Sequence, residues 1–234
     1  MTNLEFSNEF DILYNSITSN NAPGLDEYEK SVFLTMAQES VVRDLYTGSL
    51  VGVSFEEQES LRRYLSNMVI TAYPEEITED TPDPISDTSV FYKLPTDVFF
   101  ITYESAVIND DSAGCKSGKK IDVYPVTQDR YNQIIKNPFR GTTDRRVLRI
   151  DAGLDIVELV YKYKIEKYYI KYVKKPKPII LVDLSTLDST LSINKESVET
   201  PCELNDSLHR TILEKAVALA KRSLVIQTVP QSNV

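Results

Sequence analysis

The sequence predicts an α+β fold, in which N- and C-terminal helices form one helical unit and a β-rich region is inserted between them. Apolar residues repeat with a helical period near both ends of the chain, whereas Val, Ile, Tyr and Phe alternate with polar residues in the middle. Helices at the two ends bury their apolar faces most simply against each other. We therefore expect the middle region to form a sandwich-like or barrel-like insertion.

The N-terminal part, residues 1–72, is expected to be helical. Its apolar residues share one face of each of two helices, with Phe6, Phe10, Leu13 and Ile17 on the first and Tyr28, Val32, Phe33 and Met36 on the second. The turn-forming sequence SNNAPG separates the two.

Two capping boxes mark helix starts in this part. Asp26 with Glu29 can satisfy the free N–H groups at the start of the second helix, which should end near Gly48. Ser54 with Glu57 repeats the pattern before a third helix whose apolar residues are Leu61, Leu65 and Met68.

Residues 73–88, YPEEITEDTPDPISDT, combine prolines with six acids and are expected to be an exposed linker. Residues 89–200 should then form the β-rich domain. Its six expected strands are DVFFITYESAVI, KKIDVYPV, RRVLRIDA, DIVELVYKYKI, KYYIKYV and PIILVDL. Between the second and third, Thr127 is expected to cap a short helix that ends before Pro138.

Residues 201–226 are expected to form the closing helix, which packs back on the N-terminal helices, and residues 227–234 a flexible tail. Asn205 or Asp206 supplies the cap. One apolar stripe follows along the helix, formed by Leu208, Ile212, Ala216, Leu219 and Ala220.

The charge balance disfavours general binding to polyanions. The chain of 234 residues has 35 acidic and 26 basic residues, a formal net charge of -9, which repels nucleic acids and anionic membranes. No uncharged apolar run approaches the roughly 20 residues that span a bilayer, and the N-terminus lacks the pattern of a secretory signal. Synthesis in a reducing cytosol is the expectation, with no membrane partner.

The residues that usually carry catalysis do not cluster. Gly114–Lys120, GCKSGKK, lacks the spacing of a phosphate-binding loop and is interpreted as a hairpin loop. His209 is the only histidine, expected to face solvent, and Cys202 precedes it by about two helical turns, too far for proton transfer. Cys115 and Cys202 have no zinc or disulfide spacing. We predict no catalytic, cofactor-binding or metal residue, and no enzyme.

The stretch Tyr161–Lys177, YKYKIEKYYIKYVKKPK, supports two hypotheses. Aromatic rings and lysines are what a single-strand binder requires. The same alternation fits a β-hairpin, with Glu166 and Lys167 in the connection, one aromatic face and one lysine-bearing face. We favour the sheet, because lysines commonly protect strand edges and tyrosines favour strands.

Three segments resemble proteins of one family. Residues 10–42, residues 168–181 and residues 202–220 are similar, in this order, to tail and head-to-tail ring proteins of crAss-like phages that infect Bacteroidales. The most specific part is NAPGLDEYEK, although Ala22 precedes its proline. The third segment also looks like the closing helix of adaptor proteins beneath the portals of short-tailed phages.

The resemblance implies a structural virion protein without catalytic residues or cofactors. Such a protein would form a closed, twelvefold homo-oligomeric ring, stacked with the portal protein and adjacent tail ring or muzzle proteins. The ring would surround a channel through which genomic DNA passes without specific binding. It would lie in the virion at the portal-proximal tail after assembly in the host cytoplasm.

Two other functions stay open. One is a nucleic-acid-binding module that uses Tyr161–Lys177. The other is an accessory virion protein for head decoration or carbohydrate binding, to which the β-rich region would lend itself.

Overall fold

The computed structural model describes the chain except residues 16–23, 48–62, 80, 144 and 229–234, and within that range it contains four α-helices and an eight-stranded sheet. The chain divides into two compact units. Met1–Met68 with Lys175–Val234 form the helical unit, and Val69–Lys174 form the sheet unit. The predicted α+β class, with a β-rich region between N- and C-terminal helices, is confirmed.

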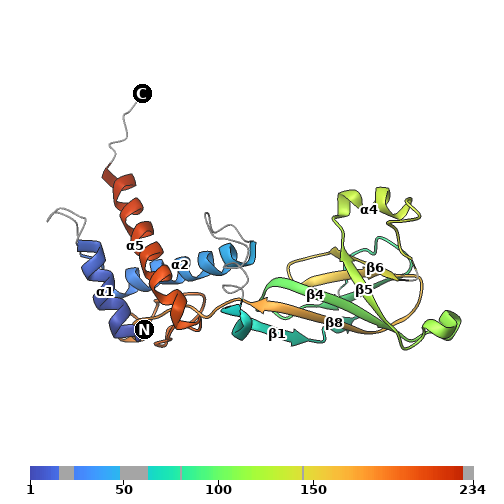
Figure 1. Cartoon of the computed structure of the whole chain (residues 1–234), viewed down its shortest axis with the longest axis horizontal. Coiled ribbons are helices and arrows are strands. Elements are labelled where there is room, and N and C mark those ends of the chain that lie inside the picture. The colour runs from blue at the N-terminus through green and yellow to red at the C-terminus, as the bar shows by residue number, and fades with distance from the viewer. Residues whose placement is uncertain (16–23, 48–62, 80, 144, 229–234) are drawn as a thin grey trace, which may run out of the picture. The chain divides into compact units, whose positions relative to one another are not determined.

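The helical unit is built from three long helices: α1 (Asn3–Asn15), α2 (Glu27–Thr47) and α5 (Asp206–Thr228). The last, coloured red in Figure 1, packs against both of the others, as predicted. Its stripe is buried at Leu208, Ile212, Ala216 and Ala220. Two short 3-10 helices, η1 (Ser66–Met68) and η3 (Leu184–Thr186), also belong to this unit.

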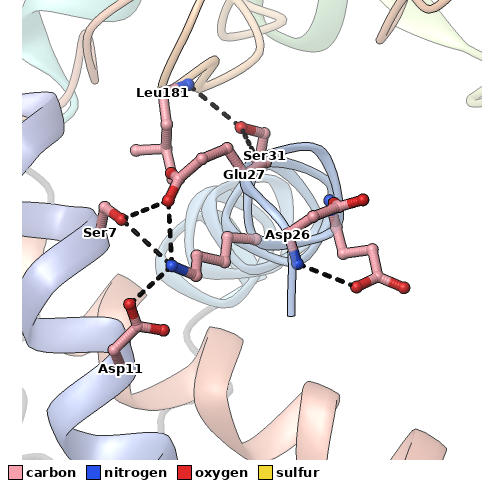
Figure 2. A network of polar contacts seen from close by, with 8 residues as sticks. Ser7, Asp11, Asp26, Glu27, Ser31 and Leu181 are labelled. Atoms are coloured by element: carbon pink, nitrogen blue, oxygen red, sulfur yellow. Dashed lines mark hydrogen bonds and ion pairs between the residues drawn. The ribbon is translucent and has the colours of Figure 1, made fainter. Parts of the chain in front are cut away.

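Two predicted caps in the helical unit are present. The Glu29 N–H donates to Asp26 Oδ1 (2.7 Å), and the Asp26 N–H donates to Glu29 Oε2 (3.1 Å), which is the predicted capping box (Figure 2). At α5, the Ser207 N–H donates to Asn205 Oδ1 (3.0 Å). The second capping box, Ser54 and Glu57, lies outside the described residues, as does most of the third predicted helix.

A buried lysine joins α1 to α2. Lys30 is 3% exposed, and its Nζ donates to Asp11 Oδ2 (2.7 Å), Glu27 Oε1 (3.0 Å) and Ser7 Oγ (3.2 Å) (Figure 2). Burial disfavours the ammonium, but the hydrogen bonds and charges of Asp11 and Glu27 outweigh it and raise the pKa of Lys30. The network therefore holds a full positive charge between the two helices.

The buried face of α2 agrees only in part with the predicted one, since Tyr28 and Val32 pack against a buried cluster. Met36 is exposed, and the buried apolar residues are Leu34, Ala37, Val41, Val42 and Leu45. The polar residues Ser31, Thr35 and Gln38 are also buried. A pattern that counts only apolar residues finds part of the buried face, and it misses the rest because it treats these three polar residues as solvent-facing.

The three polar residues bind the backbone of an extended segment, Lys177–Leu181. The Leu181 N–H donates to Ser31 Oγ (3.0 Å), the Ile179 N–H donates to Thr35 Oγ1 (3.1 Å), and Gln38 Nε2 donates to the Lys177 carbonyl (2.7 Å). Figure 2 shows the first of these bonds. The prediction that PIILVDL forms a strand of the sheet was wrong. The segment is extended, but helix side chains replace a neighbouring strand, apart from one bridge between Ile180 and Thr200.

The sheet unit contains eight strands: β1 (Val69–Ala72), β2 (Glu75–Ile77), β3 (Ser89–Lys93), β4 (Val98–Ile108), β5 (Lys120–Pro125), β6 (Arg146–Asp151), β7 (Ile156–Val160) and β8 (Ile165–Lys174). Their order is β1-β8-β4-β5-β6-β7-β3-β2. All neighbours are antiparallel except β5 and β6. The last five strands were predicted, whereas β1, β2 and β3 were not.

The sheet curls until its two edges approach each other. Tyr73 and Pro74 alone connect β1 at one edge to β2 at the other, so three Cα–Cα steps, about 11 Å, span the gap at that point. The rings of Tyr92 in β3 and Tyr168 in β8 are 5.2 Å apart, although four strands lie between β3 and β8 in the sheet order. The inner face of the curl is the core of this unit.

One helix covers part of the outer face. The parallel pair β5 and β6 requires a crossover connection, which contains α4 (Gln128–Ile135). Figure 1 shows α4 outside the sheet, and Tyr131 packs there with Leu148, Ile150 and Val160. The predicted N-cap position, Thr127, is confirmed, although its side chain makes no capping hydrogen bond.

The sequence GCKSGKK connects β4 to β5, which confirms the hairpin interpretation. The connection contains η2 (Asp111–Lys116) and returns to the sheet where the Gly118 N–H donates to the Ile108 carbonyl (2.7 Å). Gly118 has φ +80°, a conformation that favours glycine.

The contact between α2 and Lys177–Leu181 yields a stability prediction. Thr35→Val keeps the shape of the side chain but leaves the buried Ile179 N–H without its acceptor, so the free energy of unfolding should fall by about 1–3 kcal/mol. Urea unfolding followed by far-ultraviolet circular dichroism measures it. The control, Thr47→Val at the exposed end of the same helix, should change the value by less than about 0.5 kcal/mol. Equal losses in both variants would contradict the prediction.

Candidate interaction surfaces

The Tyr161–Lys177 stretch does not form the predicted hairpin. Glu166 and Lys167, expected in the connection, lie inside β8, and the bend comes earlier, at residues 161–164. There the Lys164 N–H donates to Asp110 Oδ2 (3.0 Å) and the Lys164 carbonyl accepts from the Asn109 N–H (3.1 Å). The loop after β4 therefore holds the bend, which no pattern within the stretch itself could indicate.

Most tyrosines of this stretch face the interior. Tyr161, Tyr168 and Tyr172 are buried in the core of the curled sheet. Alternation along β8 places Tyr169 and Lys171 on the outer face instead, as the sheet hypothesis predicted. Of the three tyrosines in β8, Tyr169 is therefore the one that a partner can reach.

The outer face carries a tyrosine–lysine cluster, which comprises Tyr73, Tyr103, Lys120 and Tyr169. The Lys120 ammonium lies 4.1 Å from the centroid of the Tyr169 ring and 5.0 Å from that of Tyr103, and the Tyr73 ring is 5.4 Å from Tyr169. A hydrogen bond with Thr71, then the charges of Lys171 and Lys120, lower the pKa of Tyr169. The lysine thus already has aromatic partners within its own chain.

A second polar group lies inside the curl. Glu104 Oε1 accepts from Arg149 Nη1 (2.7 Å) and from the Tyr168 hydroxyl. All three side chains are largely buried. Burial, followed by the negative charge of Glu104, raises the pKa of Tyr168, so the phenol stays protonated. The arrangement is a structural ion pair, in which Arg149 Nε alone lacks a hydrogen-bond partner, rather than an acid and base poised to exchange a proton.

The expectation that His209 faces solvent was wrong, because it is 3% exposed. Its Nε2 lies 3.0 Å from the Leu204 carbonyl, so Nε2 carries the proton and Nδ1 accepts from the Met1 amine at 2.7 Å. Burial lowers the pKa of His209. The amphipathic stripe alone did not reveal this, because the partners come from distant sequence.

Cys202 is a structural thiol. It donates to Gln38 Oε1 (3.2 Å), and burial raises its pKa to about 11. The thiol is therefore protonated at neutral pH and a poor nucleophile. Within the described residues, no three side chains of the metal-binding types come together, and no described helix is long and apolar enough to cross a membrane.

These geometries favour contact surfaces over a reaction centre, and sequence comparison identifies the family. The family model described as phage tail ring protein 3/4 matches residues 1–231. The chain belongs to this family. It is thus a structural ring protein of a crAss-like phage tail, part of the virion, and the family suggests a non-enzymatic role.

Two relatives of this ring protein come from Bacteroides phage crAss001. The first, named Ring protein 3, is 47% identical over 222 residues, which cover 94% of this chain and 95% of the relative. The second, named Ring protein 4/5, is 34% identical over 224 residues, with coverage of 93% and 91%. The resemblance noted from the sequence is confirmed.

The buried ion pair of this ring protein yields a second prediction. Glu104→Ala leaves Arg149 buried without its partner, so the free energy of unfolding should fall by about 3–5 kcal/mol. The double variant Glu104→Leu with Arg149→Met removes both charges and should recover most of the loss. Chemical denaturation of the three proteins measures this, and a double variant no more stable than Glu104→Ala would refute it.

His209 yields a third prediction. The pKa of its imidazole should lie below the ordinary value of about 6.5, because burial and then the positive charge of the Met1 amine outweigh the opposing effects of the Leu204 carbonyl and Asp206. The stability that it contributes is then present above pH 6.5 and is lost as the pH falls through the lower folded-state pKa. Since it is the only histidine, its NMR signal is unambiguous. A folded-state pKa above that of the urea-unfolded chain would contradict the expectation.

Proposed function

We propose that this protein forms a closed, twelvefold ring in the portal-tail complex and surrounds the channel through which the genome is ejected. The family match over residues 1–231 carries the proposal, because it extends through both units. The named relatives are ring proteins of similar length. The portal protein and adjacent tail ring or muzzle proteins are its proposed partners.

The helical unit offers the surfaces for contacts between subunits. Leu4 and Ile12 of α1 are 72% and 66% exposed and, eight residues apart, share a helix face. Met36 of α2 is exposed on a different helix. A closed ring joins two different patches head to tail, which these separate apolar sites can supply. The sheet unit would then project outward or meet the next ring.

The charge of the chain fits passage of DNA without specific binding. Every phosphate retained by a lysine would slow transit, and a formal charge of -9 disfavours such retention. The accessible lysine of the tyrosine–lysine cluster is already placed over two rings of its own chain. Assembly would occur in the host cytoplasm, and the position would be portal-proximal.

The fourth prediction concerns ring assembly. The purified protein, alone or mixed with the portal and neighbouring ring proteins, should form twelvefold rings visible by electron microscopy and mass photometry. Ile12→Glu places a charge in the proposed contact and should abolish rings, whereas Val198→Glu, at a comparably exposed apolar position (60%), should leave them intact. Circular dichroism confirms that both variants fold. A protein that stays monomeric even with the portal present would refute the proposal.

A further inference from the structure

The curled sheet is not closed between residues 165–169 of β8 and the edge strand β2, and this gap is called the seam. β1 pairs Val69–Ala72 with residues 170–173 of β8, but β8 begins at Ile165. Figure 1 shows β1 beside β8. Residues 165–169 therefore have β4 on one side and, among the described residues, no strand on the other. A row of backbone N–H and C=O groups is free to pair there.

The opposite side of the seam is β2. After Ala72 the chain leaves β8, passes through Tyr73 and Pro74, and pairs with β3 as β2. Within the described part of the chain β2 has no other neighbour, so its outer edge is also unpaired. Two unpaired edges thus border one gap, which is the geometry that accepts an added strand.

A cavity of roughly 580 Å³ lies in this gap. Residues from both borders line it: Tyr73, Pro74 and Glu76 on the β2 side, and Glu166, Lys167 and Tyr168 on the β8 side, with Tyr92 and Val107. The cavity therefore belongs wholly to the sheet unit.

One wall of the cavity includes a polar group that lacks a partner. Tyr92 is 2% exposed, and its hydroxyl is buried without a hydrogen bond in the described structure. Burial, then the charge of Glu76, raises the pKa of Tyr92 to about 12, so the phenol is neutral. A buried hydroxyl without a partner costs stability, and here that cost falls in the wall of the cavity.

The charge of the cavity favours a cation. Glu76 is the cross-strand partner of Tyr92, so its side chain points toward the same inner face of the sheet. Glu166 lies 3.8 Å from the ammonium of Lys167, which offsets its charge, whereas Glu76 has no ion pair among the described residues. A carboxylate beside tyrosine rings is the environment that binds a guanidinium or ammonium group.

We propose that the seam between β2 and β8 binds an extended segment of a partner polypeptide that carries an arginine or lysine side chain. The segment's backbone pairs with the free strand edges, and its basic side chain lies between Glu76 and the tyrosine rings. We take the partner to be a different protein, and occupation of the seam by a second copy of this chain is one outcome of the test below. This inference does not require the ring geometry proposed above.

Blocked pentapeptides test the proposal with the full-length protein. VTRTV can form a strand and places its arginine between two valines on one face. VTETV reverses the charge, and VPRPV removes two backbone donors. Calorimetry should show that VTRTV binds at least about tenfold more tightly than either of the others. Hydrogen exchange should slow at amides of residues 75–77 and 165–169 when VTRTV is bound.

Two neighbouring glutamates give matched variants. Glu76→Gln should weaken VTRTV binding about tenfold by removing the inward carboxylate. Glu75→Gln, which lies opposite Lys93 and points to the other face of the same strand, should change it less than about twofold. Both positions are exposed at a sheet edge, so neither change should prevent folding.

Three results would overturn the proposal. One is equal binding of VTRTV and VTETV, and another is equal loss from Glu75→Gln and Glu76→Gln. The third is protection of the same amides by self-association without peptide, which would make a second copy the occupant. Ring formation is measured separately, so a chain that fails to assemble can still bind the peptide, and the reverse also holds.

Discussion

The backbone of Lys177–Leu181 has to be satisfied after the chain leaves the sheet, and α2 does this with side chains. Ser31, Thr35 and Gln38 recur about once per helical turn, roughly 5.4 Å, while alternate residues of an extended chain recur about every 6.6 Å. The two repeats are close enough for three successive contacts. Ile179, Ile180 and Leu181 are also buried here, so the same contact anchors the first part of the connection between β8 and α5. The side chains of α2 therefore fix the segment that leads from the sheet back into the helical unit.

The sheet unit is subject to a different constraint. Its inner face encloses a narrow space, which side chains must fill. Tyrosines occupy much of it, and their hydroxyls then require partners. Glu104 satisfies Tyr168 and is itself balanced by Arg149. Tyr92 lacks such a partner and lies where the sheet is not closed. The two rings lie 5.2 Å apart and both line the cavity, so the difference between them is the carboxylate of Glu104, which reaches only Tyr168.

Sequence reasoning succeeded where the signal was local and repeated. The Asp26–Glu29 capping box, the α5 stripe and the long strands β4 to β8 all follow from contacts within a few residues or from extended alternation. It failed where distant residues decide. β1 and β2 are only four and three residues long, and they exist because β8 and β3 pair with them. The burial of His209 likewise depends on residues at the other end of the chain.

The candidate surfaces show the same division. Alternation correctly placed Tyr169 and Lys171 on the outer face of β8, but it could not reveal that Lys120, from another strand, lies over the Tyr169 ring. The unpaired edges of the seam could not be predicted, because lysines indicate a strand edge in general but not which stretch of β8 lacks a neighbour. Family membership supplied the virion role, which no single residue of the chain encodes.

The entry and exit of the sheet unit are neighbours, because Val69 pairs with Val173 across β1 and β8. Paired residues in an antiparallel ladder have Cα atoms about 5 Å apart, so a short turn can replace everything between them. Residues 69–174 are therefore inserted into the helical unit through two adjacent strand ends, so a change of length or shape within the sheet unit need not move the residues on either side of it.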